Sequence, residues 1–103
     1  MRTHGAIDNR SLALARAIAA KIDADPAHSG LERARAVCRR WYAKEPTETY
    51  REWLVILSKP WSEVRKVLVD ESELGQRLRQ SAPFCGILTP RERWDIYRSY
   101  ARS

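Results

Sequence analysis

Apolar residues recur every three or four positions along most of this chain, which is the period of an α-helix with one buried face. Leu14, Ile18 and Ile22 repeat within an Ala-rich segment and predict a first helix over about Asp8–Ala24. Residues 1–6 lack this period, and we expect them to fray. Further helices are predicted over Ala27–Lys44, Thr47–Ser58, Trp61–Leu68, a short segment carrying Leu74 and Leu78, and Pro90–Ala101.

Prolines and helix-capping residues mark the boundaries between these segments. Asp25 and Pro26 provide an N-cap and a first-turn proline, although Gly30 could delay the second helix to Leu31. Pro46 ends that helix, and Lys59-Pro60 interrupts the next pair. Because no alternating β-branched run is present, we expect an all-α fold, a compact bundle of five or six helices in a single domain over residues 1–103.

Between the last two helices the helical period disappears. Residues 81–88 form an apolar loop, and the helix that follows opens with three agreeing signals. Thr89 is a preferred N-cap residue, Pro90 suits the first helical position, and Glu92 completes a capping box. An apolar loop in so small a protein either plugs the end of the bundle or contacts a partner, and both alternatives remain open.

The 103 residues, of which 44% are hydrophobic, are enough for one small core and exclude large cofactor enzymes. No apolar stretch approaches the roughly 20 residues that cross a bilayer, so we expect a cytoplasmic protein without membrane contact. Fifteen Arg against four Lys, with many Ala, suggest a bacterial source.

Candidate chemical groups are few and scattered. Cys38 and Cys85 have no metal-ligand spacing, and we expect both to be buried or half-buried apolar residues. His28 is expected to face solvent in a first helical turn. The carboxylates of residues 70–73 suit a helix start, where the helix dipole favours negative charge. We therefore predict no catalytic residue, no metal and no cofactor, and hence a protein that is not an enzyme.

The net charge of +6 raises the alternative of a DNA- or RNA-binding regulator. The second helix carries five cations against Glu32 alone, a net charge of +4 over residues 31–44. A solvated helix surface is the simpler explanation, and two of these cations border the apolar face, where Arg stems also cover a core. The candidate nucleic-acid contacts are Arg33, Arg35, Arg39, Arg40 and Lys44.

Protein binding has more support, because four Trp among 103 residues is a high content of the residues that dominate interfaces. Trp41 and Trp53 lie on apolar stripes and are expected to fill the core. Residues 77–94, RLRQSAPFCGILTPRERW, resemble a C-terminal pattern of small Arg-rich bacterial proteins regarded as antitoxins of two-gene toxin modules. The similarity extends to the Ala-rich first helix and to residues 39–41.

The resemblance implies a small cytosolic helical protein that binds and silences a partner enzyme, with no catalytic residues to transfer. We therefore expect an antitoxin-like inhibitor whose partner is a cognate toxin that handles nucleotide or RNA, since Arg can enter an acidic active site. The chain has no obvious separate DNA-binding domain, which puts autorepression in doubt. The expected partner-binding residues are Arg79, Phe84, Cys85, Ile87, Leu88 and Arg93.

Overall fold

A computed structural model describes the backbone of residues 2–101 and the side chains of residues 9–99. Within this range the chain is all-α and contains no strand, so the predicted fold class is confirmed. The helices are α1 (Arg2–Asp23), α2 (Ser29–Lys44), α3 (Glu48–Leu57), α4 (Trp61–Leu68), α5 (Glu73–Arg79) and α6 (Pro90–Ala101). The expected fraying of residues 1–6 lies partly outside the described residues, and the backbone of α1 is helical from Arg2.

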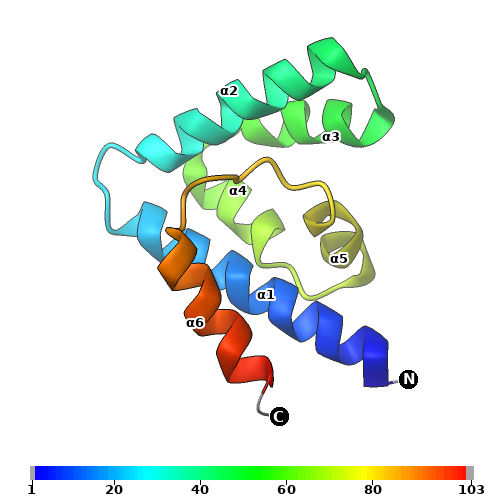
Figure 1. The fold of residues 1–103 in the computed structure, drawn as a ribbon. Coiled ribbons are helices and arrows are strands. Elements are labelled where there is room, and N and C mark those ends of the chain that lie inside the picture. The colour runs from blue at the N-terminus through cyan, green and yellow to red at the C-terminus, as the bar shows by residue number, and fades with distance from the viewer. Residues whose placement is uncertain (1, 102–103) are drawn as a thin grey trace.

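The six helices form three groups (Figure 1). Helices α2 and α3 pack side by side as a hairpin, while α1 and α6 lie together at the opposite side of the molecule with both termini. Helices α4 and α5 fill the space between these pairs. None of the described helices is long and apolar enough to span a membrane.

The core is assembled from the apolar faces that the sequence pattern predicts. Trp53 lies at its centre, fully buried, and its indole N–H donates a 2.9 Å hydrogen bond to the carbonyl of Leu78. This hydrogen bond satisfies the polar atom that a buried Trp brings into the core. The other Trp expected in the core, Trp41, is only half-buried and pairs with Tyr50 at a ring-centroid distance of 5.4 Å.

Capping side chains set several helix ends. Thr89 and Glu92 form the predicted capping box: the Thr89 hydroxyl accepts from the Glu92 N–H at 3.1 Å, and the Glu92 carboxylate accepts from the Thr89 N–H at 2.7 Å. Thr47 likewise caps α3 by accepting from the Tyr50 N–H. Helix α2 begins at Ser29 rather than Ala27, because the carboxylate of Asp25 caps a separate turn, accepting from the N–H groups of Ala27 and Ser29.

Candidate functional site

The loop that joins α5 and α6 lies against the bundle with its apolar residues turned inward. Phe84 is 5% exposed and packs against Trp53 in a T-shaped arrangement, and Leu88 is 8% exposed. The plug alternative therefore holds for these two residues, and the expectation that they anchor a partner at the surface is wrong for this conformation. Ile87 is half-buried, while Cys85 is exposed.

Arg33 fixes the exposed part of this loop to α2. Its Nε donates a 3.1 Å hydrogen bond to the carbonyl of Cys85. The next residue, Gly86, has a φ of 73°, which L-residues rarely adopt, and a Cβ added there would lie 2.7 Å from the Arg33 guanidinium. Glycine thus lets the loop pass directly beneath the Arg33 side chain.

Five of the six expected partner-binding residues nevertheless meet at one cleft. This cleft has a volume of about 460 Å³ and opens between α1, α6 and the loop. Its apolar floor includes Leu14, Ile18 and Phe84, whereas Arg93 and Tyr97 of α6 supply a polar wall. The expected residues that line it are Arg79, Phe84, Cys85, Leu88 and Arg93; Ile87 lines a neighbouring hollow instead.

Arg79 is a structural residue of this cleft. Its side chain is buried, and Nη1 donates to the carbonyls of Leu68 at 3.3 Å and Asp70 at 2.5 Å. The Leu68 carbonyl belongs to the last residue of α4, where helical backbone oxygens lack intrahelical partners, and Asp70 follows two residues later. The guanidinium therefore satisfies the end of α4, and the expectation that Arg79 contacts a partner directly is wrong in this conformation.

Charged and aromatic side chains hold α6 against α1 along the cleft. Lys21 and Glu92 form a 2.7 Å ion pair between the two helices. The Arg10 guanidinium lies 5.4 Å from the centre of the Tyr97 ring, within the range of a cation–π contact. Arg93 donates to the Tyr97 hydroxyl at 3.5 Å, and this hydrogen bond raises the pKa of the guanidinium. Arg93 is thus an exposed, permanently charged group at the cleft wall.

The five basic residues of α2 fall into two groups. Two of them, Arg33 and Arg35, donate hydrogen bonds to backbone carbonyls of the chain. Arg35 donates to the carbonyls of Leu57 at 2.6 Å and Lys59 at 3.1 Å, at the end of α3. The solvated-surface explanation is therefore wrong for Arg35, which is half-buried, whereas Arg33 is exposed and combines solvent contact with its hydrogen bond to the loop. The remaining cations are exposed and make no ion pair with a described residue; they are Arg39, Arg40 and Lys44.

The cysteines and His28 lie in different surroundings from one another. Cys38 is fully buried as expected, and burial raises the pKa of its thiol. Cys85 is exposed, so its expected burial is wrong. His28 is a left-handed residue at the start of α2, half-buried beside Trp61 at a ring-centroid distance of 6.0 Å, rather than a solvent-facing side chain. Among the described residues, no group of three or more His, Cys, Asp or Glu could hold a metal ion.

Sequence inspection missed a second surface feature, an apolar groove between α3, α4 and α5. Val55 and Leu74 are more than half exposed there. The sequence pattern places Leu74 only on a narrow helical stripe and Val55 in a short apolar run. The signal that could have found Val55 is its register, since it lies opposite the buried Trp53 and Leu57 on α3. Leu74 shares a face with the buried Leu78, four residues on, so its register gives no such signal.

Comparisons of this chain with protein-family models, with curated proteins and with solved structures found no match. Its function must therefore be inferred from its own surface.

Proposed function

We propose that this chain is a non-catalytic inhibitor of the antitoxin kind, which binds a partner protein at the cleft between α1, α6 and the loop of residues 80–89. The observation that supports the proposal is the cleft itself, whose lining combines the exposed residues Cys85 and Arg93 with the buried residues Arg79, Phe84 and Leu88. They come from α5, the loop and α6, so the cleft exists only in the folded chain.

The chemistry of the cleft favours an acidic protein segment with one apolar anchor. An apolar side chain can rest on the floor beside Leu14 and Ile18, where burial stabilises a complex by about 25 cal/mol for each Å² removed from water. Arg93, exposed at the wall, can pair with a carboxylate in the two-pronged geometry that Arg provides. The carboxylate-rich metal-binding site of a nucleotide-handling toxin would supply such an acidic segment.

The cleft is held in shape before any partner arrives. The Arg33 hydrogen bond fixes the loop, the capping box fixes the start of α6, and the Lys21 to Glu92 pair joins α6 to α1. Pre-organisation lowers the entropy cost of binding, so a modest contact area can give useful affinity.

Photo-crosslinking in the native host tests this proposal. A crosslinking amino acid would replace Arg93 at the cleft or, as the matched control, the exposed Lys66 of α4. We expect one protein to be captured from position 93 and absent from position 66. That protein, expressed alone, should arrest growth, and co-expression of this chain but not of Arg93→Glu should restore it. Equal capture at both positions, or no rescue, would overturn the proposal.

Nucleic-acid binding remains the second candidate, supported by the exposed Arg39, Arg40 and Lys44 of α2. Replacing these three by Gln should reduce the salt dependence of duplex binding by about 0.9 in the log–log slope for each phosphate that the variant no longer neutralises. Unchanged affinity and slope would remove this candidate.

A further inference from the structure

The groove between α3, α4 and α5 lies apart from the cleft and shares no lining residue with it. It has a volume of about 500 Å³. Val55 of α3 and Leu74 of α5 are 58% and 53% exposed on its walls, with Val67 of α4 at the base. Exposed apolar residues are ordinary when single, whereas a groove that gathers two of them offers a surface on which a partner can bind.

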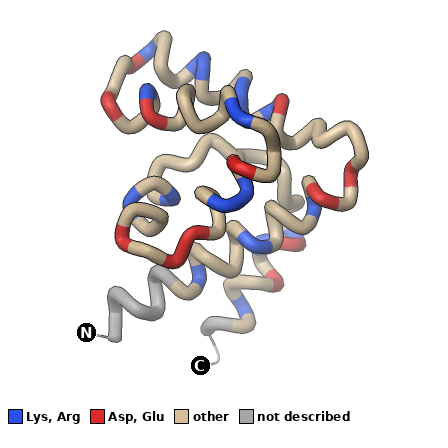
Figure 2. The backbone as a smooth tube through the Cα atoms, turned by 180° about the vertical axis from the view of Figure 1, so that it is seen from behind, with Lys and Arg blue, Asp and Glu red and all other residues tan. Residues whose placement is uncertain are grey.

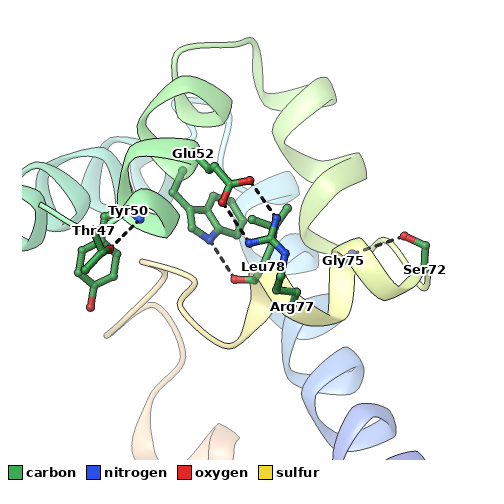
Figure 3. A network of polar contacts seen from close by, with 8 residues as sticks. Thr47, Tyr50, Glu52, Ser72, Gly75, Arg77 and Leu78 are labelled. Carbon is green, nitrogen blue, oxygen red and sulfur yellow. Dashed lines mark hydrogen bonds and ion pairs between the residues drawn. The ribbon is translucent and has the colours of Figure 1, made fainter.

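The groove has firm walls, because side-chain contacts join α3 to α5. Arg77 donates to both carboxylate oxygens of Glu52, at 3.0 and 2.9 Å, and the Trp53 indole bonds to the Leu78 carbonyl (Figure 3). A paired guanidinium and carboxylate of this kind give geometric specificity as well as energy. The spacing of the two helices is therefore set without help from a ligand.

The borders of the groove are acidic, although the chain as a whole carries +6. The lining of the groove includes the carboxylates of Glu48, Glu52 and Asp70 against the single cation Arg51. The flanking segments 45–52 and 70–73 contain six carboxylates in all. Both segments lie on the same side of the molecule, at the left of Figure 2. Arg51 pairs with Glu48, Arg77 with Glu52 and Arg16 with Glu71. Six carboxylates against these three cations still leave the two segments net negative.

We infer that this groove binds a basic amphipathic helix of a partner protein. Such a helix places apolar side chains at positions i, i+4 and i+7 on one face, and that face would cover Val55 and Leu74. Lys or Arg residues beside the apolar stripe would meet the carboxylates of residues 45–52 and 70–73. Helix α3 is about 15 Å long at 1.5 Å per residue, so it can flank roughly two to three turns of a bound helix.

Designed peptides test the inference directly. The probe is a peptide of roughly 15 residues, long enough to form a helix, with Leu at i, i+4 and i+7 and Lys on the flanks. A control peptide carries Glu in place of every Lys. Fluorescence anisotropy at low salt should give a Kd at least tenfold lower for the Lys peptide, and Glu48→Gln with Glu73→Gln should reduce that preference.

Truncating the exposed apolar side chains distinguishes binding in the groove from nonspecific binding elsewhere on the surface. Val55→Ala with Leu74→Ala should weaken the Lys peptide at least tenfold, while Trp94→Ala, which removes an equally exposed ring on α6, should leave its Kd unchanged. Equal binding of the Lys and Glu peptides, no binding of either, or no effect of the truncation would overturn the inference. If sedimentation shows a dimer and the truncation dissociates it, a second copy of the chain covers the groove, and the inference of a partner helix is overturned.

Discussion

Phe84 and Trp53 pack in a T-shaped arrangement, with ring centroids 5.9 Å apart and planes at 74°. Aromatic pairs prefer this geometry because the positive edge of one ring meets the negative face of the other. The contact joins the loop to α3, so the loop that forms the floor of the cleft is also part of the core.

Phe84→Ala should lower the free energy of unfolding by about 3 to 5 kcal/mol, because it leaves a cavity beside Trp53. Urea denaturation measures this loss. Trp94→Ala, a truncation of the 58% exposed Trp on α6, should change stability by no more than about 0.5 kcal/mol. A stable Phe84→Ala variant would mean that the loop does not plug the bundle.

Gly86→Ala should destabilise the protein by about 1 to 2 kcal/mol, since a left-handed backbone is unfavourable for Ala and its Cβ displaces Arg33. Gly86→Asn has the same Cβ but tolerates this φ better, so its loss should be smaller. Thermal melts of both variants provide the comparison. Equal losses of stability would mean that the contact with Arg33, and not the left-handed backbone, causes the destabilisation.

Glu92→Gln should reduce the dependence of the free energy of unfolding on pH in acid. Hydrogen bonds from Lys21 and from the Thr89 backbone lower the pKa of Glu92 from 4.5 to about 2. A lowered carboxylate pKa stabilises the fold above the unfolded value of 4.5, and this stabilisation is lost as the pH falls toward 2. Urea titrations from about pH 5 to about pH 2 should therefore show a smaller slope for the variant. An unchanged slope would rule out this contribution.

Arg35→Gln should lower the free energy of unfolding by about 1 to 3 kcal/mol, because it removes donors from the carbonyls of Leu57 and Lys59. Arg40→Gln, a matched change at an exposed cation of the same helix, should stay within about 0.5 kcal/mol. Chemical denaturation of the pair checks this, and similar losses would contradict a structural role specific to Arg35.

A thiol reagent should modify the folded protein at Cys85 alone. Cys38 is fully buried, and burial raises the pKa of its thiol, so little reactive thiolate is present there. Titration should give one thiol under native conditions and a second after denaturation. Rapid reaction of both in the folded state would show that the core around Cys38 opens readily.

Local information in the sequence determined the helices and several of their ends. Apolar periodicity acts over three or four residues, and the capping box of Thr89 and Glu92 closes within one turn, so neither depends on distant parts of the chain. For the same reason the all-α fold class could be predicted, as could the buried position of Trp53.

Only the tertiary structure decided what the individual side chains of the loop and of α2 do. Arg33 bonds to a carbonyl 52 residues away, Arg35 to the end of α3, and Phe84 meets Trp53, contacts that no local pattern contains. The groove beside Val55 and Leu74 likewise exists because α3, α4 and α5 pack without covering it. Spacing along a helix fixes which residues share a face, whereas packing between helices fixes which faces remain open.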